Sequence, residues 1–249
     1  MVHFVGAGPG AKDLITVRGK ELIEAADVII YAGSLVNPEL LEYAGANCRV
    51  FNSAYMTLDE VIGEMKKAKD ETLVRLHTGD PSLYGAIKEQ MDILDELGIE
   101  YDVTPGVSAA FGAAASLGIE YTLPSVSQSL IITRMEGKTK VPKKESIEAF
   151  ASHGASMAVY LSAGMLEELS ERLIKGGYDK NEPAAIVYKA TWDDEKKYLC
   201  TVETLAQTAE KHGITKTAVI LVGKALSAGE YEKSKLYSPD FETEFRKKR

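Results

Sequence analysis

Glycine-rich segments with polar neighbours recur in the first half of the chain, and the first is Gly6-Ala7-Gly8-Pro9-Gly10-Ala11. Glycine lets a backbone approach a ligand closely, and this spacing satisfies the GxGxx(G/A) pattern of dinucleotide-binding loops. Two features argue against a nicotinamide cofactor. Pro9 removes a backbone N–H from the turn that would face a pyrophosphate. The apolar run 27–31 ends in Ala32-Gly33-Ser34, without the acidic residue that holds a ribose. A tight turn without a ligand is the alternative.

The second segment, Thr78-Gly79-Asp80-Pro81, directly follows the apolar run 72–76. The Asp80 carboxylate can accept hydrogen bonds from a ribose or an ammonium group, and Gly79 allows a ligand to come close. An Asp-Pro turn or a helix cap is an equally open interpretation, because this pair is common in both. The segment is therefore a candidate binding loop.

The third segment is Thr104-Pro105-Gly106-Val107-Ser108-Ala109, which again follows an apolar run and leads into a helical pattern. Its small residues leave space, and Ser108 offers a hydroxyl group. The alanine-rich run 109–115 favours close helix packing over ligand contact. Three glycine-bearing loops in one region exceed what packing alone requires, so together they indicate a binding site.

These segments need a scaffold that brings them to one edge, and the pattern of the first 119 residues supplies one. Apolar runs alternate with amphipathic helical patterns, which predicts a mostly parallel sheet covered by helices. Ligands of such sheets bind beyond the carboxyl ends of the strands, where all three segments lie. Thr57 and Glu60 have capping-box spacing, and Gly98 suits a helix C-terminus. We expect strands at 2–5, 27–31, 48–51, 72–76 and 101–103, and helices at 17–26, 38–43, 58–69, 86–97 and 107–117.

The pattern changes near residue 120, which predicts a second α/β domain with a mixed sheet. The expected fold class is therefore α/β, with domains 1–119 and 120–249. The charged tail of the second domain ends in Arg246-Lys247-Lys248-Arg249, which we expect to be solvated and frayed. The expected strands of this domain are 129–134, 157–161, 184–189, 197–200 and 217–222, and its helices are 165–175 and 203–211.

Bulk composition excludes several classes of protein. The net charge of −8 disfavours a nucleic-acid partner. No apolar run approaches the roughly 18 residues of a membrane span, and the N-terminus lacks the features of a signal peptide. Cys48 and Cys200 are the only cysteines and neither is part of a CxxC pair, so we expect no metal site and a reducing cytoplasm.

The ordered set of segments resembles the tetrapyrrole (corrin/porphyrin) methyltransferase family. The resemblance covers residues 2–225 and adds the segments 159–162, 183–191 and 217–223 to the three glycine loops. It implies two α/β domains with a cofactor cleft between them and S-adenosyl-L-methionine as methyl donor, with S-adenosyl-L-homocysteine as product. It also implies a tetrapyrrole substrate and a homodimer.

The resemblance also implies site residues. The substrate side would include Gly8, Pro9 and Gly10. The donor side would take Gly79, Asp80, Leu83, Ser108 and Ala109 from the first domain, and Ser162, Ala190 and Ala218 from the second.

A tetrapyrrole with many carboxylates needs a local basic patch on this acidic protein. Residues 134–145 hold five basic and two acidic side chains, a net charge of +3. Arg134 ends an expected strand where this loop begins, so we expect it, together with Lys12, to bind the substrate. A solvated, flexible loop is the alternative. Methyl transfer from a sulfonium depends on positioning rather than on a protein nucleophile, so no catalytic residue is assigned.

Within the family, residues 31–36, 121–124, 127–134 and 190–192 most resemble the precorrin-4 C11-methyltransferases. This resemblance implies methylation of C11 of (cobalt-)precorrin-4 in cobalamin biosynthesis. Another precorrin methyltransferase, acting on precorrin-2 or precorrin-3, is the alternative. An rRNA 2′-O-methyltransferase of the same fold fits the acidic charge less well. A non-enzymatic nucleotide-binding regulatory module would be expected to lack the glycine loops or Asp80.

Overall fold

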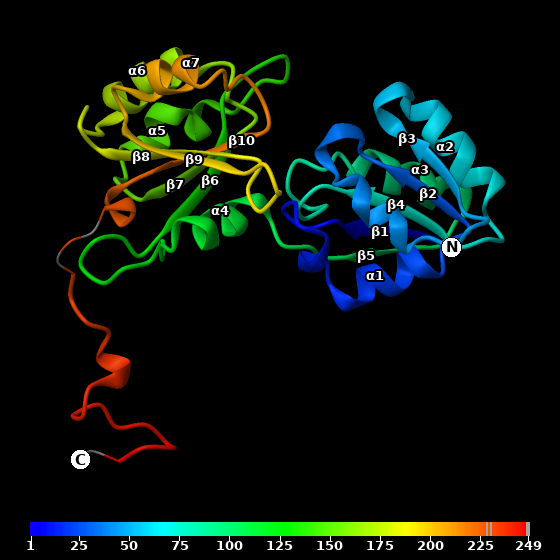
Figure 1. Cartoon of the computed structure of the whole chain (residues 1–249), viewed down its shortest axis with the longest axis horizontal. Helices are drawn as coiled ribbons and strands as arrows, with labels where there is room; N and C mark the ends of the chain where they lie inside the picture. Colours follow the sequence, from blue (N-terminus) through cyan, green and yellow to red (C-terminus); the bar gives the residue numbers. More distant parts are fainter. Residues whose placement is uncertain (228, 230, 248–249) are drawn as a thin grey trace. The chain divides into compact units, whose positions relative to one another are not determined.

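The structure is a computed structural model that describes residues 1–227, 229 and 231–247 (Figure 1). The chain forms two compact units. Unit 1 contains Met1–Ser116 and Lys189–Lys196, and unit 2 contains Leu117–Tyr188 and the described residues from Lys197 onward. The sequence predicts Lys189–Lys196 in the second domain, but the structure places this segment in unit 1. A folding boundary between residues 119 and 120 stays a prediction. Lys248 and Arg249, at the basic end of the chain, lie outside the described residues.

Unit 1 is built on a five-stranded parallel sheet, which confirms the predicted sheet type. The strand order is β3-β2-β4-β1-β5, so β4, β1 and β5 are neighbours. The three glycine segments follow these three strands, and they therefore leave the sheet side by side. The strands are β1 (Val2–Gly6), β2 (Val28–Tyr31), β3 (Arg49–Asn52), β4 (Leu73–His77) and β5 (Tyr101–Thr104).

Helices cover both faces of this sheet because successive strand residues point to opposite sides. Ile29 of β2 packs in one core with Ile23 of α1, whereas Ile30 packs in the other core with Met65 of α2 and Leu94 of α3. The predicted helix at residues 38–43 is a 3-10 helix. The helices are α1 (Val17–Glu24), α2 (Leu58–Lys67), α3 (Lys88–Leu97) and α4 (Ala109–Leu117), with 3-10 turns η1 (Lys12–Leu14), η2 (Gly33–Leu35), η3 (Pro38–Tyr43) and η4 (Ser53–Tyr55).

The predicted capping box at the start of α2 is confirmed. The Glu60 N–H donates to the Thr57 hydroxyl at 3.3 Å, and the Glu60 carboxylate accepts from the Thr57 N–H at 2.7 Å. Gly98 ends α3 in the left-handed conformation, with a φ of 63°, as its position predicts. These local signals are readable from sequence because both partners lie within one helical turn.

Thr57→Ala is expected to lower the free energy of unfolding by about 1 kcal/mol, since it removes the side-chain acceptor of an otherwise unpaired helix N–H. Urea denaturation measures this change. Thr57→Ser, which keeps the hydroxyl group, should unfold close to the wild-type midpoint. An unchanged midpoint for Thr57→Ala would contradict the role of the cap.

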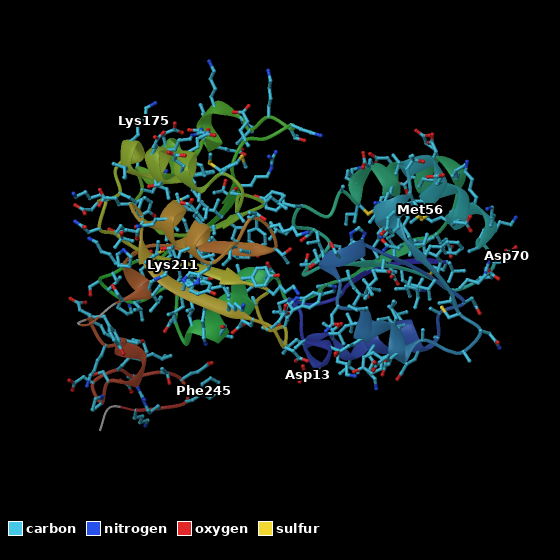
Figure 2. All side chains as sticks on the ribbon, turned by 45° about the horizontal axis from the view of Figure 1, so that its top comes forward. Asp13, Met56, Asp70, Lys175, Lys211 and Phe245 are labelled. Carbon is cyan, nitrogen blue, oxygen red and sulfur yellow. The ribbon has the colours of Figure 1, made fainter. Side chains whose placement is uncertain are left out.

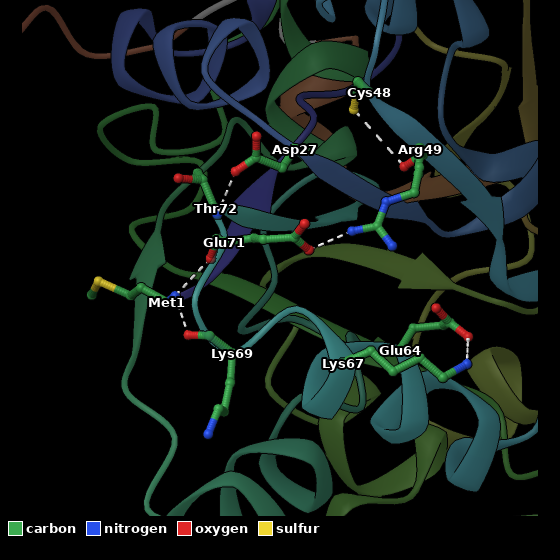
Figure 3. Close-up of polar contacts among 9 residues, drawn as sticks. All are labelled: Met1, Asp27, Cys48, Arg49, Glu64, Lys67, Lys69, Glu71 and Thr72. Carbon is green, nitrogen blue, oxygen red and sulfur yellow. Dashed lines mark hydrogen bonds and ion pairs between the residues drawn. The ribbon is translucent and has the colours of Figure 1, made fainter.

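The amino-terminal edge of the unit 1 sheet is closed by polar contacts of the protein itself (Figure 3). The N-terminal ammonium donates to the carbonyl oxygen of Glu71 at 2.8 Å, and the Thr72 N–H donates to the Asp27 carboxylate at 2.9 Å. Asp70, before β4, and Asp13, after β1, lie on opposite sides of unit 1 (Figure 2). The glycine segments are thus separated from this closed edge by the full length of the strands.

Unit 2 contains the predicted mixed sheet, in the order β6-β7-β10-β8-β9. β6 and β7 are parallel, whereas β10 runs antiparallel to both β7 and β8. In the described part of the unit, one core joins the sheet to the α-helices that follow β6, β7 and β9 (Figure 1). The strands are β6 (Leu130–Arg134), β7 (Ser156–Tyr160), β8 (Pro183–Tyr188), β9 (Lys196–Thr201) and β10 (Ala218–Val222).

The helices of unit 2 include one that the sequence analysis missed. α5 has only five residues, too few for a periodic pattern, but Ser146 before it accepts the Ala149 N–H at 3.2 Å as an N-cap. Within the described residues, no helix is long and apolar enough to cross a membrane. The helices are α5 (Ile147–Ala151), α6 (Leu166–Gly176) and α7 (Leu205–Lys211), with 3-10 turns η5 (Lys143–Glu145), η6 (Lys224–Leu226) and η7 (Lys235–Tyr237).

Candidate functional site

Three loops meet at the carboxyl edge of the unit 1 sheet: the β1 loop (residues 7–11), the β4 loop (78–87) and the β5 loop (105–108). The β1 and β4 loops form a short antiparallel bridge. The Gly79 N–H donates to the carbonyl of Gly8 at 2.8 Å, and the Gly8 N–H donates back at 3.3 Å. Gly8 has a φ of 79° and Gly79 a φ of 60°, positive values that residues with a side chain rarely adopt. The turn therefore needs glycine at both positions.

Glycine is also required where the β5 loop passes the other two. A Cβ atom on Gly106 would lie 2.1 Å from the carbonyl oxygen of Gly79 and 2.8 Å from the Cα of Gly6. A Cβ atom on Gly6 would in turn lie 2.6 Å from Gly106. The three strand ends therefore touch backbone to backbone. This close approach leaves no room for a side chain between the three loops at these positions.

Asp80 fastens the β4 loop to the β5 loop. One carboxylate oxygen accepts the Gly106 N–H at 2.9 Å, and the other accepts the Ser82 N–H at 2.9 Å and the Ser82 hydroxyl. Burial on its own would raise the pKa of Asp80, but these hydrogen bonds outweigh it and lower the pKa. Asp80 is therefore ionised at neutral pH. It makes the turn that one interpretation predicts, and its remaining lone pairs can still accept from a ligand.

The other predicted donor residues of unit 1 lie beside Asp80. The Leu83 N–H donates to the carbonyl of Asp80 at 3.2 Å. A Cβ atom on Gly79 would lie 3.5 Å from the Cα of Ser108 and 3.7 Å from the nitrogen of Ala109. Ser108 is buried and Leu83 is half-buried. The structure thus gathers five of the predicted donor residues at one edge of one sheet.

The β1 loop is held by the segment Lys189–Lys196. The Ala11 N–H donates to the hydroxyl of Thr191 at 3.0 Å. A Cβ atom on Gly10 would lie 2.1 Å from a ring carbon of Trp192 and 2.7 Å from the carbonyl oxygen of Ala190. The resemblance implies that Ala190 comes from the second domain, but the structure places it in unit 1, buried against the loop predicted to face the substrate.

Thr191 and Glu195 are two residues of this segment to which the sequence assigned no site role. The Thr191 N–H donates to the Glu195 carboxylate at 2.6 Å, and Glu195 also accepts from the hydroxyl of Ser116, at the end of α4. Gly112 of α4 packs on the same loop, since a Cβ atom there would lie 2.7 Å from the Pro9 side chain. The segment 190–192, singled out above for its resemblance, was the available signal, although resemblance does not show what a residue touches.

Ser162 and Ala218 are the residues of unit 2 that are predicted to contact the methyl donor. Ser162 is fully buried, and its hydroxyl accepts the Met135 N–H at 2.9 Å and donates to the carbonyl of Tyr160 at 2.7 Å. A contact of Ser162 with the methyl donor would therefore use the backbone of Ser162. Ala218 begins β10 and is half-buried. That these two residues share a site with the loops of unit 1 stays a prediction.

The two basic residues predicted to bind substrate already have partners. Lys12 pairs with Glu42 at 2.9 Å on the surface, and Glu42 raises the pKa of Lys12. Arg134 donates to the carbonyl oxygens of Met135, Thr139 and Lys140 at 3.0–3.4 Å, so it closes its own loop. Within the described residues, no carboxylate pairs with Arg134, and its charge stays available to an anion.

Arg134 also lines a cavity of about 310 Å³ in unit 2. Arg172 and Glu148 also line this cavity and pair with each other at 2.9 Å, whereas Lys143 has no carboxylate within 4.0 Å among the described residues. Lys175 projects from α6 at the same cavity (Figure 2). The basic loop thus adjoins a hollow that can admit an anionic group.

The described residues hold no cluster of side chains that could bind a metal ion, and the Ser82 hydroxyl of the β4 loop is bonded to the Asp80 carboxylate. His77, at the end of β4, is 4% exposed, and its Nε2 has no hydrogen-bond partner in the described residues. Burial, with a smaller effect from the charge of Arg75, lowers the pKa of His77 to about 3, so the ring is neutral. It packs 6.1 Å from the ring of Phe4. The loops can therefore bind and orient ligands through their peptide groups and Asp80.

Comparison with known proteins agrees with this arrangement. The family model of the tetrapyrrole (corrin/porphyrin) methylases matches residues 1–206. A cobalt-precorrin-4 C(11)-methyltransferase of Methanocaldococcus jannaschii is 52% identical over 99% of this chain and 96% of its own length. A precorrin-4 C(11)-methyltransferase of Sinorhizobium is 43% identical over 98% of both chains.

Solved structures show the same fold. A crystallised cobalt precorrin-4 methyltransferase superposes with a TM-score of 0.88 at 41% identity, covering 91% of this chain and 96% of that one. A uroporphyrin-III C-methyltransferase of Thermus thermophilus, solved with S-adenosyl homocysteine, reaches 0.76 at 22% identity over 91% and 93% of the two chains, which shows the fold alone. By sequence and by fold, this chain belongs to the tetrapyrrole (corrin/porphyrin) methylase family.

Proposed function

We propose that this protein uses S-adenosyl-L-methionine to methylate C11 of precorrin-4 or cobalt-precorrin-4 in cobalamin biosynthesis. The observation that carries this proposal is the 52% identity to a cobalt-precorrin-4 C(11)-methyltransferase, which extends over 99% of the chain. Identity of this extent covers the β1, β4 and β5 loops and the basic loop of unit 2. Direct transfer of a methyl group needs alignment of two reactants rather than a covalent intermediate, and loops that bind and orient ligands can supply it.

The donor would lie against the β4 and β5 loops. S-adenosyl-L-methionine supplies a methyl group on a positively charged sulfur, and the sulfur keeps the electron pair when the methyl carbon bonds to C11. Gly79 and Gly106 let the β4 and β5 loops pass backbone to backbone, since a Cβ atom on Gly106 would clash with the Gly79 carbonyl oxygen. Asp80, ionised and already oriented by Gly106 and Ser82, can accept from a ribose hydroxyl or the donor's ammonium group.

The tetrapyrrole would lie against the β1 loop, at Gly8, Pro9 and Gly10. Trp192, the single tryptophan of the chain, packs against Gly10 and can report binding there. Acetate and propionate groups of the substrate would be drawn to the net +3 loop of residues 134–145 in a protein of net charge −8. Lys12 and Arg134 would contribute to this attraction.

The test is a set of reactions with a ¹³C-methyl donor and four substrates: precorrin-4, cobalt-precorrin-4, precorrin-2 and precorrin-3. We expect one labelled methyl group at C11 of a precorrin-4 substrate, located by NMR and mass spectrometry. Labelling of precorrin-2 or precorrin-3 instead would replace the proposed substrate by that of another family member. Salt-sensitive quenching of Trp192 by RNA, with no response to tetrapyrrole, would overturn the proposal.

Arg134→Ala is expected to raise KM for precorrin-4 about tenfold, because a charge-assisted contact is lost and the loop it closes is released. The Kd of S-adenosyl-L-homocysteine should stay unchanged. Rising salt should weaken tetrapyrrole binding to the wild type more than to the variant, since exposed charges are screened. Arg49→Ala, which removes an arginine paired with Glu71 at the amino edge, is the matched control and should leave KM unchanged. Indifference of KM to Arg134→Ala would remove this residue from the substrate site.

We also propose that the protein works as a homodimer in the cytoplasm. The family resemblance supports the dimer, and the two cysteines, Cys48 and Cys200, are unpaired and half-buried, which suits a reducing compartment. Light scattering on the purified protein measures the oligomeric state. A monomer at micromolar concentration would contradict the proposed dimer.

A further inference from the structure

Arg75 is a buried cation without an acidic partner among the described residues. It lies in the middle of β4 and is 7% exposed. Its Nε donates to the side-chain oxygen of Gln90 at 3.2 Å, and its Nη1 donates to the carbonyl of Ile30 at 3.1 Å. Burial lowers the pKa of Arg75 to about 10, so it remains charged at neutral pH. Burying a charge without a counter-charge costs free energy of folding, which indicates that the guanidinium has a role other than stabilising the fold.

Gln90 connects Arg75 to the β4 loop through two hydrogen bonds of its side-chain amide. It lies in the first turn of α3, is 4% exposed, and donates from its Nε2 to the carbonyl oxygen of Ala86 at 3.0 Å. An amide has one accepting and one donating end. Because the cation takes the accepting end, the donating end must face Ala86. The orientation of the Gln90 side chain is therefore set by Arg75.

The part of the loop that Gln90 holds has an unfavourable backbone conformation. Tyr84 and Ala86 have φ values of 57° and 49°, although neither is glycine. A Cβ atom on Gly85, between them, would lie 2.1 Å from the carbonyl of Pro81. Such conformations persist only where the surroundings hold them. The same loop begins with Asp80 and Leu83, so its shape decides where these two residues stand.

We propose that Arg75 and Gln90 are positioning residues for the methyl donor. The buried guanidinium orients the Gln90 amide, and the amide holds the Ala86 carbonyl so that the β4 loop keeps its ligand-ready shape without a ligand. Binding then costs less conformational entropy than it would with a loop that must first be ordered. This inference rests on the proposed function, in which the β4 loop binds S-adenosyl-L-methionine.

The test separates the hydrogen bond from Gln90 to the Ala86 carbonyl from the stability of the fold. In Gln90→Glu, one carboxylate oxygen still accepts from Arg75 and adds a counter-charge, while the other faces the Ala86 carbonyl and cannot donate to it. We expect a melting temperature within a few degrees of wild type or above it. We expect the Kd of S-adenosyl-L-homocysteine, measured by calorimetry, to rise about tenfold.

A second variant covers the case in which Gln90→Glu fails to fold. Arg75→Met combined with Gln90→Met replaces the buried polar pair by apolar side chains of similar length, an exchange that proteins often tolerate. It too should weaken S-adenosyl-L-homocysteine binding about tenfold. Ser170→Ala is the matched control, since it removes a buried side-chain bond to the Val202 carbonyl in unit 2. It should lower the melting temperature without changing the Kd.

Amide hydrogen exchange without ligand measures how firmly Gln90 holds the β4 loop, independently of binding of the methyl donor. Amides of residues 83–87 should exchange at least about tenfold faster in Gln90→Glu than in wild type, while those of α2 stay unchanged. Wild-type affinity in both Gln90→Glu and the double variant, or unchanged exchange at residues 83–87, would overturn the inference. A wild-type protein that does not bind S-adenosyl-L-homocysteine, but whose loop exchange responds as expected, would instead contradict the proposed function.

Discussion

Gly106→Ala is expected to lower the free energy of unfolding by about 3 kcal/mol and to abolish binding of S-adenosyl-L-homocysteine. The added methyl group would lie 2.1 Å from the Gly79 carbonyl oxygen and 2.8 Å from the Gly6 Cα, and both of these are backbone atoms. A side chain could rotate away, but the ends of β1 and β4 are held by the sheet. The β5 loop must therefore move, and the Asp80 contact to Gly106 is lost with it.

Urea denaturation and calorimetry measure these two effects. Gly63→Ala is the matched control, because Gly63 lies inside α2 with no atom within 4 Å of its added Cβ. This control should be stabilised by about 0.5–1 kcal/mol and should bind the ligand normally. If Gly106→Ala bound with wild-type affinity, the close packing of the three loops would have no part in the donor site.

Asp80→Ala is expected to weaken S-adenosyl-L-homocysteine binding about 100-fold, since it removes a carboxylate that takes part in charge-assisted bonds and the clamp between two loops. Asp80→Asn keeps one acceptor for the Ser82 N–H but loses the charge, so its affinity should be intermediate. Calorimetry at neutral pH gives all three affinities. If wild type and Asp80→Ala bound S-adenosyl-L-homocysteine with equal affinity, Asp80 would stabilise the turn but take no part in ligand binding.

The stability of these variants should depend on pH in a defined direction. The pKa of Asp80 is lower in the folded protein than in the unfolded chain, so its contribution is fully present above the ordinary value of about 4. That contribution is lost as the pH falls through the folded pKa. The stability deficit of Asp80→Ala should therefore be largest near pH 7 and should shrink toward about pH 3. A deficit that does not change with pH would mean that the charge of Asp80 contributes nothing.

Much of the fold could be predicted from sequence because its signals are local. The alternation of apolar runs and helical patterns predicts the strands of both sheets, mostly within one or two residues of the observed bounds. The capping box of Thr57 and Glu60 was legible because the two residues are three positions apart. α5 was missed because five residues hold too little periodicity. The family could be identified for a related reason, since its glycine loops each occupy a few consecutive residues.

The sequence by itself thus determined most of the secondary structure, the two sheet types and the family. Only the tertiary structure decided which parts meet. Strand order brings the loops after β4, β1 and β5 together, and lets Asp80 bind Gly106, 26 residues away. The packing of the segment Lys189–Lys196 in unit 1 brings Thr191 to Ala11 across 180 residues, although the sequence predicts this segment in the second domain. Such contacts arise from packing of distant segments, which leaves no periodic trace in the chain.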